Sequence, residues 1–203
     1  MPTKTYLRLP KEKQERIFDA GVEEFAQHRF SEASINRIVK SAGISRGSFY
    51  QYFQGKEDLY LLIMEHISKE KMTIFAQQPL PPVQTNVFEM MAWAMPAIFD
   101  WAQQHPKYNQ IGFLMAHDDN TFVRKILKQI DSGKKAIRTL LENDQKSGKI
   151  RKDADIDTVI ELIVLFSEAL FCEYYFGEGR EKAIAKIRSM LDVLERGICD
   201  RSE

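Results

Sequence analysis

Cysteine is scarce in this chain of 203 residues, which contains only Cys172 and Cys199. Two cysteines without CxxC spacing provide neither a disulfide framework nor a thiolate metal site. The first residues, MPTKTYLRLPKEKQ, also lack the apolar run of a signal peptide. We therefore expect the protein to work in the reducing cytoplasm.

A long apolar run free of charge is missing as well. The most apolar segment, 159–176, contains three glutamates, at positions 161, 168 and 173. Because each would cost about 2.5–3.5 kcal/mol near the centre of a bilayer, we expect no membrane-spanning helix. Apolar residues make up 44% of the chain and charged residues 29%, which is typical of a globular protein and not of a disordered one.

Patterns typical of catalysis are absent too. The four histidines stand in separate segments without a ligand spacing such as HExxH. No glycine-rich phosphate loop occurs, and the GxSxG match at 43–47 lies between predicted helices, whereas a nucleophilic serine of this motif follows a strand. We read His117-Asp118-Asp119 as a local turn in which Asp118 or Asp119 caps a helix. We therefore expect no enzyme, no cofactor and no metal site.

Helical periodicity of apolar residues runs through nearly the whole chain, without β-type alternation, internal repeats or low-complexity tracts. The pattern predicts an all-α protein of about nine helices, in which Pro96 kinks or interrupts the helix at 86–104. The proline-rich stretch 77–82 cannot lie inside a helix and is the predicted linker. The helices expected outside the central motif cover about 10–27, 55–75, 86–104, 106–117, 120–146, 155–176 and 183–198.

The segment 34–56, SINRIVKSAGISRGSFYQYFQGK, predicts two short helices joined by a tight turn. Apolar residues from Ile35 to Ala42 share one face, and Gly43 follows where a backbone needs positive φ. Ser45 is a good N-cap for the second helix, whose Phe49 and Phe53 point inward. This arrangement is typical of a DNA-binding helix-turn-helix, and an ordinary αα-hairpin with a solvated face is the alternative.

The outward face of this motif carries side chains suited to DNA. Arg46 can read a guanine edge, and Ser48 and Gln51 can hydrogen-bond to bases. Tyrosine, lysine and the polar residues of the first helix suit phosphate oxygens. The predicted DNA-binding residues are Ser34, Arg37, Ser45, Arg46, Gly47, Ser48, Tyr50, Gln51, Tyr52 and Lys56.

The run from Gly43 to Leu59, GISRGSFYQYFQGKEDL, resembles the signature of the tetracycline-repressor (TetR) family of bacterial transcription regulators. The signature has the form G-x-S-x-G-x-x-Y-x-x-F-x-x-K-E-x-L. The resemblance extends back to an amphipathic first helix, where Phe25 and Phe30 hold the family's aromatic places, and covers about a quarter of the chain. The matching residues are Gly43, Ser45, Gly47, Tyr50, Phe53, Lys56, Glu57 and Leu59.

Charge is divided unevenly along the chain although its net value is zero. Residues 1–56 contain ten basic and six acidic residues, so the rest of the chain carries the compensating excess of acid. A basic head favours a phosphate backbone at that end, and chance scatter of surface charge is the alternative.

The helix at 155–176 is apolar on nearly all sides and must therefore be covered on all sides. Covering by a second copy of the chain predicts a homodimer, and a central core helix of a monomer is the alternative. The resemblance implies a four-helix interface from the last two helices. The predicted interface residues are Val164, Phe171, Ile187, Leu191, Leu194 and Ile198.

Large aromatics and methionines are concentrated in the middle of the chain. Such residues can line a cavity for an apolar or amphipathic ligand, or they can be plain core. The resemblance implies a ligand pocket in this half without naming its contents. The candidate effector-binding residues are Trp93, Phe99, Trp101, Tyr108, Phe113, Met115, Phe122 and Phe166.

Together these observations predict a helix-turn-helix DNA-binding domain at 1–56, a connecting helix at 56–76 and a helical ligand-binding and dimerisation domain at 57–203. The expected function is that of a dimeric repressor that binds a palindromic operator. The resemblance implies that a small effector releases it by moving the connecting helix like a lever. The alternative is a DNA-binding protein of the same fold that a protein partner controls.

Overall fold

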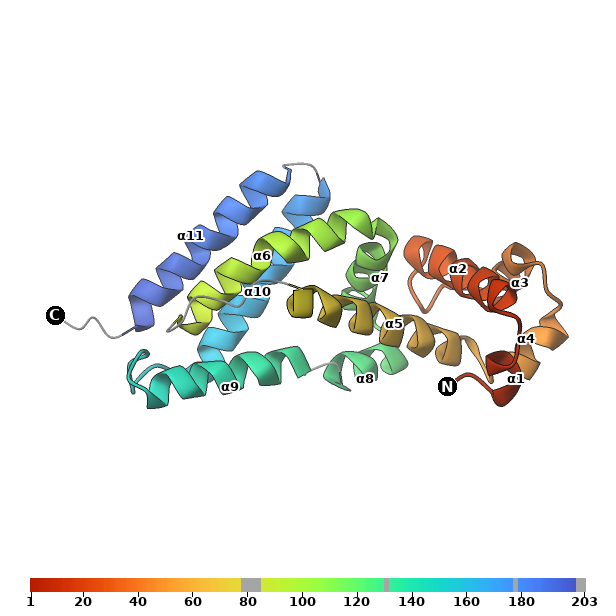
Figure 1. Cartoon of the computed structure of the whole chain (residues 1–203), viewed down its shortest axis with the longest axis horizontal. Helices are drawn as coiled ribbons and strands as arrows, with labels where there is room; N and C mark the ends of the chain where they lie inside the picture. Colours follow the sequence, from red (N-terminus) through yellow and green to blue (C-terminus); the bar gives the residue numbers. More distant parts are fainter. Residues whose placement is uncertain (78–84, 130–131, 177–178, 200–203) are drawn as a thin grey trace. The chain divides into compact units, whose positions relative to one another are not determined.

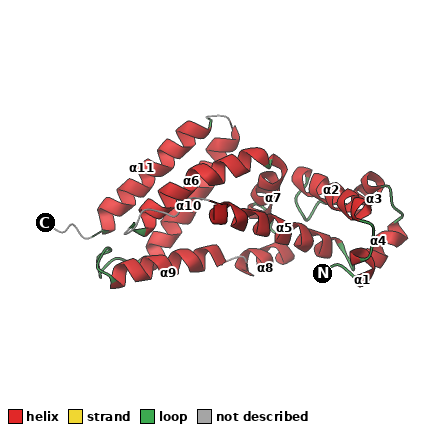
Figure 2. Ribbon diagram, viewed as in Figure 1, coloured by secondary structure: helices red, strands yellow, loops and turns green. Residues whose placement is uncertain are grey.

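The computed structural model describes residues 1–77, 85–129, 132–176 and 179–199 (Figure 1). These residues form eleven helices and no extended sheet, with a single antiparallel bridge between Ile150 and Cys199 (Figure 2). The predicted all-α class is therefore confirmed. In this part of the chain we find no helix with the length and apolar character needed to span a membrane. The predicted linker lies, except for Gln77, outside the described residues.

Two helix boundaries differ from the prediction of about nine helices. A four-residue helix, α1 (Lys4–Leu7), precedes the first predicted helix and is too short to show a periodic pattern. The long helix expected at 120–146 appears as α8 (Thr121–Gln129) and α9 (Ser132–Lys146), on either side of residues outside the description. Helical periodicity continues across this point, so the pattern alone did not reveal two elements.

Two compact units can be distinguished, and we name them the head unit and the body unit. The head unit comprises residues 1–76 and 101–128. It contains α1, α2 (Lys11–Gln27), α3 (Ile35–Ala42), α4 (Arg46–Tyr52), most of α5 (Lys56–Gln77), the last residues of α6 (Val87–Gln104), α7 (Pro106–Ala116) and most of α8.

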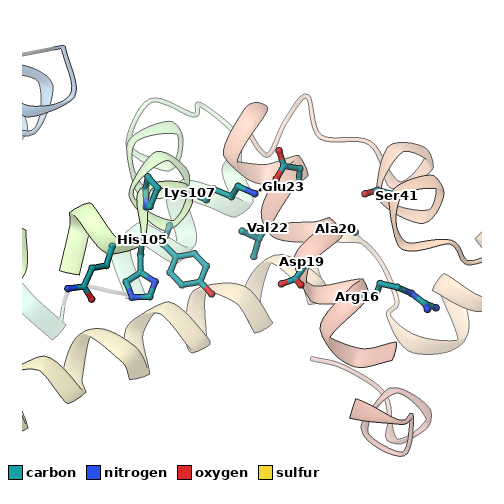
Figure 3. Close-up of a pocket in the computed structure, with 11 residues that line it drawn as sticks. Arg16, Asp19, Ala20, Val22, Glu23, Ser41, His105 and Lys107 are labelled. Atoms are coloured by element: carbon teal, nitrogen blue, oxygen red, sulfur yellow. Dashed lines mark hydrogen bonds and ion pairs between the residues drawn. The ribbon is translucent and has the colours of Figure 1, made fainter. Parts of the chain in front are cut away.

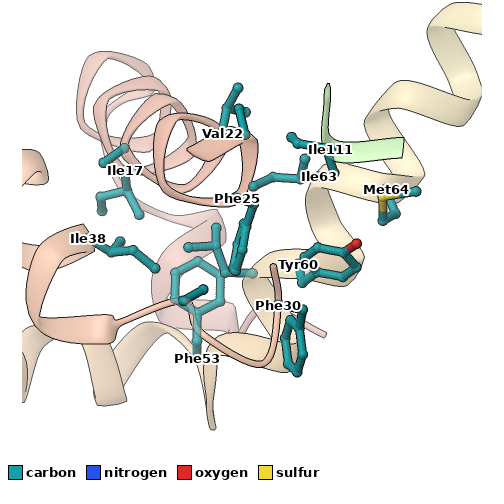
Figure 4. Close-up of a cluster of buried hydrophobic side chains, with 14 of the residues drawn as sticks. Ile17, Val22, Phe25, Phe30, Ile38, Phe53, Tyr60, Ile63, Met64 and Ile111 are labelled. Atoms are coloured by element: carbon teal, nitrogen blue, oxygen red, sulfur yellow. The ribbon is translucent and has the colours of Figure 1, made fainter. Parts of the chain in front are cut away.

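The core of the head unit joins its first helices to α5 and α7 (Figure 4). Ile17, Phe25, Phe53 and Ile63 are almost completely buried there. Gly21 of α2 allows a close approach to α5, because a Cβ at this position would lie 2.9 Å from a side-chain carbon of Ile63. The helix-turn-helix region therefore shares one hydrophobic core with the beginning of α5.

The body unit comprises residues 77–100 and 129–203. Its core lies among the first part of α6, α9, α10 (Ile156–Phe176) and α11 (Arg180–Ile198), and Phe88, Leu141 and Ile163 are buried in it. The chain passes between the two units within α6, after Asp100, and this helix runs on through Pro96. The two units are defined by how the chain packs and not by function, so the predicted division into a DNA-binding domain and a ligand-binding domain near residue 56 stays a prediction.

Candidate nucleic-acid interface

The turn between α3 and α4 has the conformation that the sequence predicts. Gly43 ends α3 with φ of 63° and ψ of 39°, in the left-handed region where a side chain is strained. Its amide and that of Ile44 return to the last carbonyl groups of α3, at 3.3 Å from Lys40 O and 3.0 Å from Val39 O. Ser45 then caps α4, because its Oγ accepts a hydrogen bond of 3.0 Å from the Ser48 amide.

The inward face of this pair of helices is apolar. Ile38, Ala42, Phe49 and Phe53 are fully buried, and the ring centroids of Phe49 and Phe53 lie 5.3 Å apart. Burial of these side chains fixes the rotation of α4 about its axis. The opposite, polar face of α4 is consequently left to solvent.

Arg46, Tyr50 and Gln51 are exposed on this outward face, and Ser48 is half-buried beside them. The Arg46 guanidinium is held at the surface, since Nη1 donates to Asn36 Oδ1 at 3.0 Å and Nη2 to the Tyr50 hydroxyl at 3.4 Å. A shallow cleft of about 420 Å³ runs between the start of α3 and α4. Its polar lining residues include Ser34, Asn36, Arg46, Tyr50, Gln54 and Lys56.

Three predicted phosphate contacts have partners inside the protein. Tyr52 is buried against Tyr6, with ring centroids 6.4 Å apart. The Lys56 ammonium donates to the carbonyl oxygens of Phe30 at 2.6 Å and Ala33 at 2.9 Å. Arg37 forms an ion pair with a carboxylate of α2, described next. Contact of these residues with DNA remains a prediction, and each has a structural part in addition.

Glu24 is a buried carboxylate that sequence reasoning did not single out. It accepts hydrogen bonds from Arg37 Nε at 2.9 Å and from the amide of Ser34, the N-cap of α3, at 2.7 Å. Burial by itself would raise the pKa of this carboxyl, but the bonds from Arg37 and Ser34 outweigh burial and lower the pKa. The available signal was its place on the apolar face of α2, seven residues after Ile17.

The candidate effector-binding aromatics do not form one cluster. Trp101, Tyr108, Met115 and Phe122 belong to the head-unit core, whereas Phe99 and Phe166 belong to the body-unit core. Trp93 and Phe113 are half-buried. Their role in ligand binding stays a prediction.

One buried donor stands out in this set. Trp101 is 7% exposed, and its Nε1 makes no hydrogen bond within the described part of the chain. Oε2 of nearby Glu70 likewise makes none, and it lies 3.8 Å from His105 Nδ1. The rings of Trp101, His105 and Tyr108 contact one another, with the centroid of His105 5.0 Å from Trp101 and 5.4 Å from Tyr108, and those of Trp101 and Tyr108 6.2 Å apart.

Cavities differ between the two units. In the head unit, a cleft of about 640 Å³ opens between α2 and α7, and Arg16, Asp19, Glu23, Lys107 and Tyr108 are among the residues that line it. Figure 3 shows Lys107 reaching towards Glu23, with which it forms an ion pair. In the body unit, α6, α10 and α11 enclose a space of only about 30 Å³. No group of His, Cys, Asp or Glu within the described ranges is arranged to hold a metal ion.

The predicted dimer-interface residues lie mostly inside their own chain. Ile187, Leu191 and Leu194 are buried in the body-unit core, and Val164 and Ile198 are half-buried. The side chain of Phe171 lies outside the described residues. Large apolar side chains exposed on these two helices are instead Leu165, at 59%, and Val193, at 66%.

The fold and the site define a helix-turn-helix protein, in which a capped α4 presents a polar face over a buried aromatic base. Residues 17–63 match the family described as "Bacterial regulatory proteins, tetR family". The chain belongs to the TetR family and is a DNA-binding transcriptional regulator. This family and this fold are those of transcriptional regulators and not of enzymes.

Similar proteins cover most of the chain. An "Uncharacterized HTH-type transcriptional regulator YdgC" of Bacillus subtilis is 27% identical over 161 residues, which are 78% of this chain and 79% of that protein. The crystal structure of a TetR family transcriptional regulator from Chloroflexus aurantiacus is 27% identical, with a TM-score of 0.80 over 99% of this chain and all of that one. FadR from Bacillus subtilis in complex with stearoyl-CoA shares the fold at 21% identity, with a TM-score of 0.68 over 91% of this chain and 98% of that one.

Proposed function

We propose that this protein is a repressor that binds a palindromic operator as a homodimer and is released by a small apolar or amphipathic effector. The observation that carries the DNA-binding part is the exposed polar face of α4, on which Arg46 is bonded to Asn36 and Tyr50, while Phe49 on the inward face is buried. A two-fold dimer presents two such faces, which matches two half-sites of a palindrome.

Within this proposal Arg46 reads a base edge. Its guanidinium is exposed and is positioned by two neutral groups, Asn36 Oδ1 and the Tyr50 hydroxyl, so its positive charge is available to a guanine. Ser48 and Gln51 add hydrogen bonds to bases, while Ser34, Ser45 and Tyr50 suit phosphate oxygens.

Replacing the guanidinium tests this assignment. An operator is first selected from a random pool of DNA duplexes by the unaltered protein, and equilibrium binding of Arg46→Ala is then measured on this operator and on single-base variants. We expect a loss of about 1–3 kcal/mol and a relaxed preference at one base pair in each half-site.

Lys69→Ala is the matched control, because it removes one positive charge from an exposed position of α5 outside the motif. Its binding should equal that of the unaltered protein. Equal weakening of Arg46→Ala on every sequence would instead assign Arg46 to a phosphate, and failure of the pool to yield any preferred sequence would contradict the operator proposal.

The effector part of the proposal rests on composition and on likeness. The small space in the body unit is lined partly by Met91, Met95, Met190 and Phe166, and flexible methionine side chains can adapt to an apolar ligand. FadR from Bacillus subtilis, which has a similar fold, was crystallised in complex with stearoyl-CoA, so a long-chain acyl-CoA is the first effector to test. The space of about 30 Å³ among α6, α10 and α11 holds no more than about one water. Binding there requires these helices to separate, which is a movement able to control DNA binding.

A further inference from the structure

The loop that joins α2 to α3, residues 28–34, is held by side chains from later elements of the head unit. We name it the α2–α3 loop. Its Phe30 packs against Tyr60 of α5 and Phe122 of α8, with ring centroids 5.1 Å and 4.8 Å away. Lys56, at the start of α5, donates to three of its carbonyl oxygens, those of Phe30, Ser31 and Ala33. The position of the loop is therefore set by contacts distant in sequence.

Asp118, between α7 and α8, also binds this loop. Only 4% of this residue is exposed. Its Oδ2 accepts hydrogen bonds from the Ser31 amide at 2.9 Å and the Ser31 hydroxyl at 3.2 Å, across 87 residues of chain. Its Oδ1 accepts one from the Asn120 amide at 2.9 Å.

The sequence predicted a different part for this aspartate. Asp118 or Asp119 was expected to cap the following helix, but Asn120 does so, because its Oδ1 accepts a hydrogen bond of 2.9 Å from the Phe122 amide. Asp119 is exposed and pairs with Arg124. Asp118 is thus free to bind Ser31 of the α2–α3 loop, and capping of α8 does not explain its burial.

A buried carboxylate is stable only while its hydrogen-bond donors stay in place. Two of the three donors to Asp118 belong to Ser31, so separating the α7–α8 junction from the α2–α3 loop would leave the charge buried with a single donor. The free energy of such a separation rises steeply with distance, because hydrogen bonds fail within about an ångström beyond normal length. The two segments should consequently move together.

The α2–α3 loop ends at Ser34, the N-cap of α3, whose amide is bonded to Glu24. A displacement of the α7–α8 junction can therefore reach α3 through this loop. Two further contacts join α7 to α2. Lys107 forms an exposed ion pair with Glu23, and such pairs contribute little, while Ile111 packs in the hydrophobic core that α7 shares with α2.

We propose that Asp118 is a positioning residue that couples the end of α7 to the helix-turn-helix through Ser31. Its part is to fix the angle at which the motif is presented, and hence the spacing of half-sites that the protein prefers. The spacing statement rests on the proposed binding of a palindrome as a dimer, whereas the coupling itself does not.

The first measurement does not involve DNA. Hydrogen exchange of backbone amides is followed by mass spectrometry in Asp118→Asn, in which one amide nitrogen can no longer accept from Ser31, and in Ser31→Ala, which loses only the hydroxyl bond. Asp119→Asn is the matched control, with the same change of charge one residue away. We expect faster exchange confined to residues 28–42 in the first two variants and none in the control.

The second measurement is operator affinity on duplexes whose half-sites are separated by one base pair more or fewer than in the selected operator. Asp118→Asn loses a hydrogen bond to a charged group, so we expect it to bind the operator about tenfold more weakly than the unaltered protein at the preferred spacing. Its preference between spacings should fall, while Asp119→Asn should bind as the unaltered protein does.

Two results would overturn the coupling: exchange that accelerates throughout the head-unit core in both variants, or exchange in the α2–α3 loop that does not change. Equal loss of affinity at all spacings would likewise reduce Asp118 to general stability. If the unaltered protein prefers no palindrome, the proposed function fails, and the exchange result still decides the coupling.

Discussion

Glu24 of α2 is a buried carboxylate that binds Ser34, the N-cap of α3, and Arg37 of α3, although glutamate side chains usually lie at the surface. Its hydrogen bonds from Arg37 and the Ser34 amide lower the pKa of the carboxyl. A carboxyl with a lowered pKa adds stability at pH values above its ordinary pKa of about 4.3, and this contribution is lost as the pH falls through the lower value.

Glu24→Gln should therefore lower the free energy of unfolding by about 1–3 kcal/mol at pH 7, because the amide loses the charge that Arg37 and the loop amide need. The difference from the unaltered protein should begin to shrink below the ordinary pKa of about 4.3, and it should disappear only once the pH lies below the lowered pKa of the folded protein. Urea unfolding over a series of pH values from neutral into acid measures it. Glu15→Gln, an exposed position of the same helix, is the control. A difference that persists unchanged in acid would exclude the charge as its cause.

The binding partner of Lys56 could not be decided from its residue type and its position in the sequence. A lysine at the end of the motif is suited to a phosphate, and that prediction is still open. In the structure its ammonium reaches carbonyl oxygens 26 and 23 residues earlier in the chain. The flexible side chain allows both, and only the proximity of the α2–α3 loop makes the second one available.

At the scale of elements, α11 shows how one helix can have two apolar roles. Residues such as Ala183, Ile187 and Leu191 recur at helical spacing and are buried in the body-unit core, which is the face that its sequence pattern predicts to be covered. Val193 of α11 is 66% exposed, and Leu165 of α10 is 59% exposed. In the proposed dimer these exposed side chains belong to the interface.

The double variant Leu165→Glu, Val193→Glu should yield folded monomers, because the new charges stay hydrated in the free subunit but would be buried in an interface. Sedimentation velocity at micromolar concentration gives the mass, and circular dichroism checks the fold. Leu191→Glu is the contrasting variant, since its charge enters the core and should lower stability by several kcal/mol. A double variant that stays fully dimeric would place the interface elsewhere.

At the scale of the whole molecule, the chain crosses between its two units at three places, one of them inside α6. An effector bound to the body unit can release DNA only if it binds the non-operator conformation more tightly than the operator-bound one. Linkage then requires operator DNA to weaken effector binding by the same factor, and such couplings are typically about 1–3 kcal/mol.

Calorimetric titration of stearoyl-CoA, with and without saturating operator, measures this coupling. We expect weaker binding of stearoyl-CoA in the presence of the operator, by about 5- to 150-fold. A duplex of scrambled sequence is the control and should leave the affinity unchanged. Identical affinities with and without operator would mean that this ligand does not control DNA binding, and no heat in either titration would remove it as an effector.

The sequence by itself determined the two helices of the motif, the turn between them and their polar face, because each depends on neighbours within a few residues. Gly43 at the left-handed position, Ser45 as a cap and the spacing of Phe49 and Phe53 are local features, and the structure has them as predicted. Only the tertiary structure decided the partners of Glu24, Lys56 and Asp118, and that the apolar face of α11 is covered within its own chain. These depend on distances in space between residues 10 to 87 positions apart, and periodicity and capping carry no information about such distances.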